Sequence, residues 1–121
     1  MEHEIHIVVI PEKEVHPYAD ALSIVRINGE QLVINHEWET GDKAVLIPAD
    51  FFVPNTKPFE FLGGKAKHRR IKPRSIRGVW SEGLMLPVTE FPELDGLPVG
   101  TNVMQILGIE RYDFENVFHN P

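Results

Sequence analysis

The stretch "ALSIVRINGEQLVIN", residues 21–35, constrains the fold more than any other part of the chain. Two runs rich in β-branched residues flank the dipeptide Asn28-Gly29. This dipeptide readily adopts the positive φ angles of a type I′ turn, which joins two antiparallel strands in register with their twist. The sequence therefore predicts a β-hairpin, with strands at about 21–27 and 31–35.

Further strand patterns occur on both sides of this hairpin. "EIHIVVI", residues 4–10, is a β-rich opening, and residues 43–47 form an apolar strand pattern that ends at Pro48. Residues 51–64 have no clear period, which favours an irregular connection with one short helical turn. Residues 76–87 indicate a bent strand or a pair of strands. Together these segments give five or six short strands.

Glycines and helix signals refine this pattern. Gly78 and Gly83 lie inside a strand pattern, where glycine usually marks a bulge or a close approach of two backbones. Thr101 or Asn102 as N-cap and Gly108 just past the end predict one short helix. We therefore expect an all-β fold, a small closed or partly closed barrel with one or two short helices.

Length and composition bound the class of protein. A chain of 121 residues with 42% hydrophobic content suits one domain, which we place at 1–121. It has no cysteine, which excludes disulfides, thiolate nucleophiles and cysteine-ligated zinc. No apolar run reaches the roughly 20 residues of a membrane-spanning helix, and the start is acidic where a signal peptide would be basic. We expect a cytoplasmic protein that does not associate with membranes.

The positive charge of this acidic chain is concentrated in one segment. Seven of the twelve Lys and Arg residues lie between positions 65 and 77, with no acidic residue among them. The rest of the chain carries eighteen acidic and five basic residues, a net charge of −13. Plain solubility is normally served by interspersed signs, so the basic segment indicates a binding site for phosphate or for an acidic partner.

Other kinds of site are disfavoured. "GGK" at 63–65 is followed by Ala66, and Phe59 stands where a P-loop needs its first glycine. The six histidines show no three-ligand metal spacing, and Ser81 lacks a Gly-x-Ser-x-Gly context. We expect no catalytic residue, no metal and no cofactor in this chain.

Two stretches resemble known nucleic-acid-binding barrels. "HPYADALSIVRI" (16–27) and "RGVWSEGLMLP" (77–87) resemble motifs of the tRNA-binding domains with an OB fold. "NGEQLVI", "GDKAVLIPADFFVP", "RIKPRSIRGVWSEGLMLP" and "LPVGTNVMQILGIERYD", in that order, resemble more closely the N-terminal OB-fold domain of a bacterial and phage RNA ligase family. This second resemblance covers residues 5–112. Tyr18 departs from the tRNA-binding motif, which usually has Asn there.

The resemblance implies a fold and a function. The fold would be a small five-stranded OB-fold-like barrel. In the ligases, a following nucleotidyltransferase domain carries the adenylated lysine of a Lys-x-Asp-Gly motif, and here no Lys is followed by Gly three positions later. The resemblance therefore implies a noncatalytic module that presents RNA or nicked duplex ends to a nucleotidyltransferase domain or partner. RNA or DNA, single or double stranded, stays open at this point.

The basic segment and the strand that follows it supply the expected site. Charge would give affinity, and Trp80 or His68 would stack on bases, unless Trp80 packs in the core. The predicted nucleic-acid-binding residues are Lys65, Lys67, His68, Arg69, Arg70, Lys72, Arg74, Arg77, Trp80 and Ser81. One alternative is a protein-interaction or self-associating module that uses residues 65–77. Another is a flexible solubilising loop, for which 63–73 is the candidate.

Overall fold

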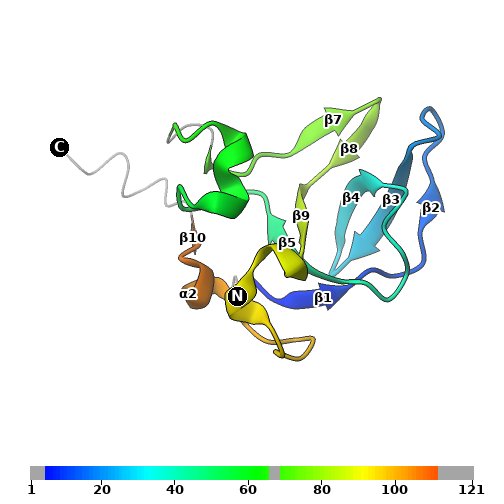
Figure 1. Cartoon of the computed structure of the whole chain (residues 1–121). Coiled ribbons are helices and arrows are strands. Elements are labelled where there is room, and N and C mark those ends of the chain that lie inside the picture. The colour runs from blue at the N-terminus through cyan, green and yellow to red at the C-terminus, as the bar shows by residue number, and fades with distance from the viewer. Residues whose placement is uncertain (1–4, 66–68, 112–121) are drawn as a thin grey trace.

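The computed structural model describes residues 5–65 and 69–111 (Figure 1). These residues form short antiparallel strands: β1 (Ile7–Val9), β2 (Glu14–Val15), β3 (Leu22–Ile27), β4 (Glu30–Asn35), β5 (Lys43–Pro48), β6 (Phe51–Phe52), β7 (Arg74–Ile76), β8 (Val79–Ser81), β9 (Gly83–Pro87) and β10 (Glu110–Arg111). The helices are short: η1 (Lys57–Leu62), η2 (Val88–Glu90), η3 (Pro92–Leu94) and α2 (Met104–Leu107). The predicted all-β class is confirmed. In the described ranges no helix is long and apolar enough to cross a membrane.

The β3–β4 hairpin forms as the sequence predicts. Asn28 and Gly29 have φ angles of 52° and 83°, the positive values of a type I′ turn. The strands pair from Ile27 and Glu30 at the turn to Leu22 and Asn35 at the open end. Strand β2 adds to the free edge of β3, which gives the three-stranded sheet β2-β3-β4.

Strand β5 is the centre of a second sheet, ordered β1-β5-β9, and is buried on both faces. Val45 and Ile47 point to one core cluster, and Ala44 and Leu46 point to another. Because successive side chains of a strand alternate between faces, a strand covered on both sides shows a continuous apolar run. This is why "AVLI" lacks the polar alternation of a surface strand.

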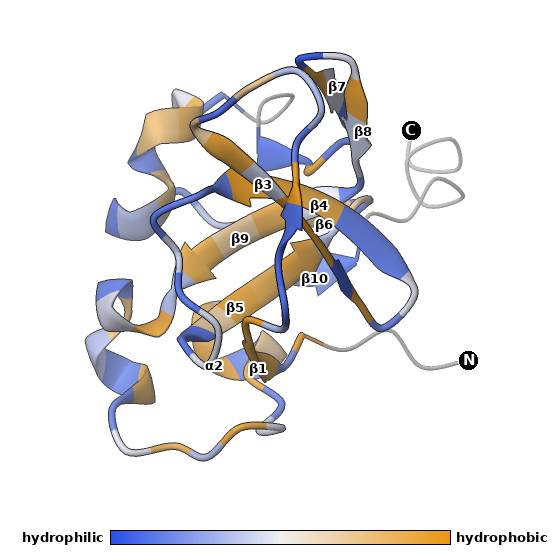
Figure 2. Cartoon of the chain, turned by 90° about the vertical axis from the view of Figure 1, so that its right-hand side faces the viewer, coloured by the Kyte–Doolittle hydropathy of each residue, from blue (hydrophilic) through white to orange (hydrophobic). Residues whose placement is uncertain are grey.

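The two core clusters lie on opposite faces of this central sheet. One cluster fills the space between the two three-stranded sheets: Ile10, Val25, Leu32, Ile34, Ala44, Leu46 and Met85. The other packs the central sheet against the short helices and their connections: Ile5, Ile7, Val45, Ile47, Phe51, Val53, Phe59, Ile71, Phe91, Leu94, Val103, Leu107 and Ile109. Figure 2 shows β5 and β9, which separate the two clusters, as predominantly hydrophobic strands.

The sheets form an OB-like fold without joining into one closed ladder. The pairs β7-β8 and β6-β10 are separate two-stranded sheets. At Gly83 a Cβ atom would lie 2.7 Å from the Ile47 carbonyl oxygen, so the expected close backbone approach is confirmed there. Gly78 is neither a bulge nor a close approach of two backbones: Arg77 and Gly78, with φ angles of 53° and 86°, form the turn between β7 and β8. The alternative of a pair of strands within 76–87 is confirmed by β8 and β9, which Glu82 alone separates.

The short helix near the C-terminal end ends where its signals predict. Gly108, at φ 69°, closes α2 in the left-handed conformation. The N-cap predicted at Thr101 or Asn102 is wrong: the helix begins at Met104 with Val103 as N-cap, and the Asn102 side-chain oxygen accepts the Met104 N–H at 3.0 Å from one position before the cap. The predicted helical turn within 51–64 is η1, which has Pro58 in its first turn and Gly63 at its end.

Candidate nucleic-acid interface

The basic segment divides into two groups. Lys65, Lys72, Arg74 and Arg77 are exposed, and none of the four has a side-chain hydrogen bond or ion pair within the described residues. Unpaired cations that share one segment leave their charge available to a ligand. The predicted residues Lys67 and His68 lie outside the described residues.

Arg69 and Arg70 instead hold the segment against the body of the protein. The Arg70 guanidinium donates twice to Asp50 Oδ1, at 3.2 and 2.8 Å. The Arg69 guanidinium donates to the Val53 carbonyl at 3.3 Å and lies 4.7 Å from the centroid of the Phe52 ring. A cation above an aromatic face is attracted by the ring quadrupole. Both guanidiniums therefore already have protein partners.

Backbone hydrogen bonds fix the same place. Val53 N–H donates to the Arg69 carbonyl, and Ile71 N–H donates to the Phe51 carbonyl, at 2.9 and 2.8 Å. Asp50 N–H donates to the Ile71 carbonyl at 2.8 Å. Residues 63–73 were expected to be flexible, but the end of this stretch at 69–71 is anchored by these bonds. The cations that follow it in sequence are therefore attached to an ordered backbone.

A groove of about 510 Å³ opens beside this anchor. Within residues 5–65 and 69–111, its lining combines three cations with apolar side chains and contains no acidic residue: Phe61, Leu62, Arg70, Ile71, Lys72, Pro73, Arg74, Gly83 and Leu84. The Phe61 side chain is 62% exposed. An exposed aromatic ring in the same groove as lysine and arginine side chains offers both a stacking surface and phosphate contacts.

Ser81 lies inside the protein, not on this surface. It is 2% exposed, and its hydroxyl oxygen accepts the Val33 N–H at 3.0 Å. Next to it, the Glu82 N–H donates to the Gln31 carbonyl at 2.8 Å, and Glu82 Oε1 accepts the Gln31 N–H at 2.9 Å. These bonds join β4 to the β8–β9 connection. Ser81 is therefore a poor candidate for direct ligand contact, because it is buried and its hydroxyl is already bonded to the backbone of β4.

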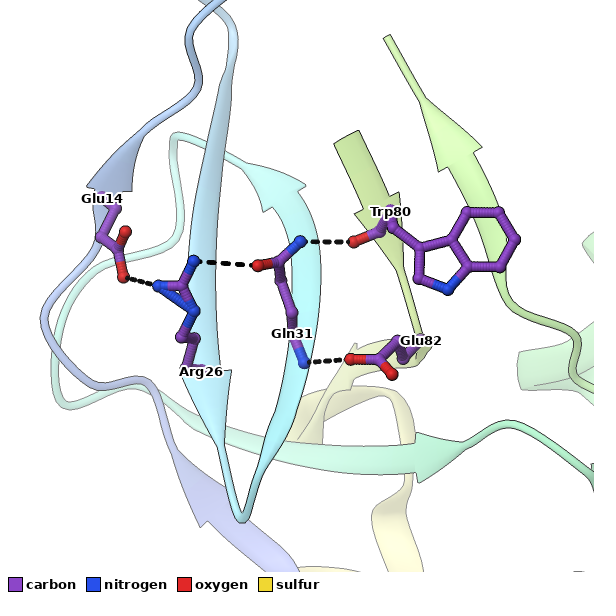
Figure 3. Close-up of polar contacts among 5 residues, drawn as sticks. All are labelled: Glu14, Arg26, Gln31, Trp80 and Glu82. Carbon is purple, nitrogen blue, oxygen red and sulfur yellow. Dashed lines mark hydrogen bonds and ion pairs between the residues drawn. The ribbon is translucent and has the colours of Figure 1, made fainter. Parts of the chain in front are cut away.

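A polar network crosses the outer side of four strands (Figure 3). Arg26 donates to Glu14 at 2.6 Å and to the Gln31 side-chain oxygen at 2.9 Å. The Gln31 amide nitrogen then donates to the Trp80 carbonyl at 2.8 Å. The network continues the backbone links between the hairpin sheet and β8, so it supports the position of Trp80.

Trp80 is exposed, so the alternative that it packs in the core is wrong. Its side chain is 51% exposed. Ser81 faces β4, and its neighbour in the strand must point to the other face of the β7–β8 hairpin. Figure 3 shows the indole directed away from β3 and β4.

The motif "HPYAD" holds the tip of the same hairpin. His16 is 2% exposed; its Nδ1 accepts the Tyr18 N–H at 3.0 Å, which leaves Nε2 as the donor to the Ile76 carbonyl at 3.1 Å. A Cβ atom at Gly78 would lie 3.5 Å from the Tyr18 ring, so Tyr18 packs against the turn. His16 and Tyr18 are thus positioning residues for β7–β8.

The carboxyl group of Glu30, the first residue of β4, is partly buried. Burial, and then the neighbouring Glu82 carboxylate, raise its pKa above the ordinary value of 4.5. Its buried Oε2 has no hydrogen-bond partner in the part of the chain that the structure describes. The protonated form is therefore favoured by folding, and this contribution is lost as the pH rises through the folded pKa.

Substitution of Glu30 tests this assignment. We expect Glu30→Gln to raise the free energy of unfolding at pH 7 by about 0.5 kcal/mol, a value reduced for solvent screening of a half-buried group. The gain should disappear below pH 4.5, where the Glu30 carboxyl of the unsubstituted protein is protonated in both the folded and the unfolded state. Urea denaturation at several pH values measures it. Glu93→Gln, at an exposed position, is the control, and an equal gain in both variants would contradict the assignment.

A second pocket, of about 700 Å³, lies between η1, the η2–η3 segment and α2. Lys57, Glu90 and Glu93 line it together with apolar residues, so its charge is mixed and does not favour phosphate. Within the described ranges, no group of three side chains is arranged to hold a metal ion.

Phe61 is the residue of the groove that the sequence analysis missed. Pro58 and Gly63, at the two ends of η1, indicate a short helix. They do not tell which of Phe59 and Phe61, with one residue between them, faces solvent. One is 1% exposed and the other 62%. Only the packing of η1 on the core decides which ring faces solvent.

The antiparallel sheets around an apolar interior, with a basic groove at the edge, define an OB-fold domain. A family model described as an OB-fold domain matches residues 5–88, and the chain belongs to this family. A search of curated proteins finds no match at the level of sequence.

Solved structures of Naegleria gruberi RNA ligase are similar to the chain. The ligase with pyrophosphate is 27% identical, with a TM-score of 0.78 over 93% of this chain and 36% of that one. A mutant of the ligase with ATP and manganese is 27% identical, with a TM-score of 0.77 over 92% and 36%. The chain thus spans about a third of the length of these ligases. The resemblance to an OB-fold domain of RNA ligases is confirmed.

Proposed function

We propose that this chain is a noncatalytic RNA-binding module that presents RNA ends to the nucleotidyltransferase domain of an RNA ligase. The groove between η1 and the start of β7 is the observation that carries the proposal. Phe61 forms an exposed aromatic surface in it, and Lys72 and Arg74 supply charge without partners of their own in the described ranges.

The chemistry of the groove fits a nucleic-acid backbone. Lysine and arginine side chains neutralise phosphates and release counterions, which supplies most of the sequence-independent affinity. An aromatic ring beside them stacks on a base whatever its sequence. Among the described residues, the lining contains no carboxylate that would repel a phosphate. Lys65 and Arg77, exposed elsewhere on the segment, extend the positive surface beyond the groove.

The similarity to RNA ligases supports RNA as the ligand. The solved relatives are RNA ligases, and this chain corresponds to about a third of their length. The sequence contains no Lys-x-Asp-Gly motif, so the nucleotidyl transfer itself is assigned to another domain or chain. The role left for this domain is to hold the RNA.

Charge reversal in the groove tests the proposal. We expect Lys72→Glu/Arg74→Glu to weaken binding of a fluorescein-labelled single-stranded RNA by about tenfold or more, because two phosphate contacts become repulsive. Fluorescence anisotropy at low salt measures this. The matched control is Lys57→Glu/Arg111→Glu, the same change in net charge at exposed positions outside the groove, which should alter affinity by less than about twofold.

Two outcomes would overturn the proposal. Equal losses in the two double variants would show that only overall charge attracts RNA and that the groove is not a site. Absence of RNA binding by the native chain would instead favour the alternative that the basic segment binds an acidic protein partner. Circular dichroism of each variant confirms that the fold is retained.

A further inference from the structure

The outward face of the β7–β8 hairpin is an unused surface next to the groove. Arg74, the first residue of β7, lines the groove, and the next residue, Ser75, is the register partner of Trp80. Opposed residues of an antiparallel pair have side chains about 5 Å apart on one face. Trp80 and Ser75 therefore share the exposed face of the hairpin, while Arg74, the register partner of Ser81, adjoins the groove at the start of β7.

Several contacts hold the inward face of the hairpin. Ser81 closes the contact with β4, the His16 ring holds the Ile76 carbonyl, and Tyr18 packs at the Gly78 turn. Gln31 adds a fourth contact through the Trp80 carbonyl. The hairpin is thus fixed by backbone and buried side-chain bonds, while the indole itself stays half exposed. A rigid platform binds a ligand with little cost of ordering.

We propose that Trp80 stacks on an unpaired base of RNA whose backbone lies in the neighbouring groove, and that this contact makes the domain selective for single-stranded RNA. The inference rests on the proposed RNA-binding function. Charge complementarity favours RNA as the ligand, because its phosphates are negative and the exposed side chains of Lys72, Arg74 and Arg77 in the same segment are positive.

Selectivity follows from the separation of charge and stacking. A duplex satisfies the cations with its phosphates as well as a single strand does, but its bases are already stacked on one another. Only an unpaired strand can turn a base onto an indole while its phosphates remain at the groove. Aromatic stacking of this kind stabilises binding by an amount that corresponds to about fivefold or more per base.

Three substitutions test the inference on the whole chain, with a labelled single-stranded RNA and a hairpin duplex RNA of equal length. We expect Trp80→Ala to weaken binding of the single strand by about fivefold or more and that of the duplex by less than about twofold. Trp80→Phe should retain most of the affinity, because a stacking ring remains. Val15→Ala, at an 87% exposed position on β2, should change neither affinity.

Tryptophan fluorescence gives a second readout. The chain has two tryptophans, and Trp38 packs partly buried against the core. We expect single-stranded RNA to quench the native emission saturably and to leave the emission of Trp80→Phe unchanged. Trp80→Ala with native affinity for the single strand, or with equal losses for both RNAs, would overturn the inference. The proposed function would still stand if the Lys72/Arg74 charge reversal weakens binding more than the Lys57/Arg111 control does. It would fail together with the inference if the native chain binds neither RNA or if the two double variants lose affinity equally.

Discussion

Gly83→Ala is expected to lower the free energy of unfolding by about 2–3 kcal/mol. The added Cβ would lie 2.7 Å from the Ile47 carbonyl oxygen and 3.3 Å from Pro48 Cα. Both atoms belong to the backbone of β5, the central strand, with Ile47 fully buried. Neither atom can move without shifting β5 between the two core clusters. Urea denaturation followed by circular dichroism measures the loss.

Gly96→Ala is the matched control for this substitution. Gly96 also has no side chain, but a Cβ there would meet no atom within 4 Å. Its φ of 82° makes alanine cost about 1 kcal/mol through backbone strain alone. A smaller loss at Gly83 than at Gly96 would show that β5 and β9 do not approach as closely as described.

Ser81→Ala is expected to cost about 1–3 kcal/mol of unfolding free energy, because it leaves the buried Val33 N–H without an acceptor. Ser75→Ala, on the exposed face of the same hairpin, should change stability by less than about 0.5 kcal/mol. Chemical denaturation of the two variants compares them directly. A loss at Ser75 as large as that at Ser81 would contradict the structural role of the buried hydroxyl.

The same substitution separates structure from binding at position 81. If Ser81 only joins β4 to the β8–β9 connection, Ser81→Ala that remains folded should bind RNA within about twofold of the native affinity. A selective loss of RNA affinity without a loss of stability would instead return Ser81 to the binding surface.

Features set by local chemistry could be predicted from the sequence. The Asn28-Gly29 turn depends on two adjacent residues, and Gly108 closes α2 by its own φ angle, so neither requires knowledge of the rest of the fold. The all-β class follows from several such signals. Gly78 shows the limit of this reasoning, because a glycine in an apolar segment signals a bulge and a turn equally well.

The division of the basic segment could not be predicted. Arg70 is paired because Asp50 lies beside it, twenty positions earlier in the chain. Arg69 and Ser81 likewise have partners far away in sequence, Val53 and Val33. A run of positive charge shows where the cations are in sequence, and only the tertiary pairing shows which of them remain available to a ligand.

The salt dependence of RNA affinity tests the central claim, that the unpaired cations of the basic segment, in the groove and beside it, hold the RNA backbone. Anisotropy titrations of single-stranded RNA over a series of KCl concentrations give the slope of log affinity against log salt. With the four exposed cations engaged, the slope should be about −2 to −3, at about −0.7 for each neutralised phosphate. Lys72→Glu/Arg74→Glu should make it shallower by about 1.4. A native slope near zero, or an identical slope in this variant, would contradict the claim.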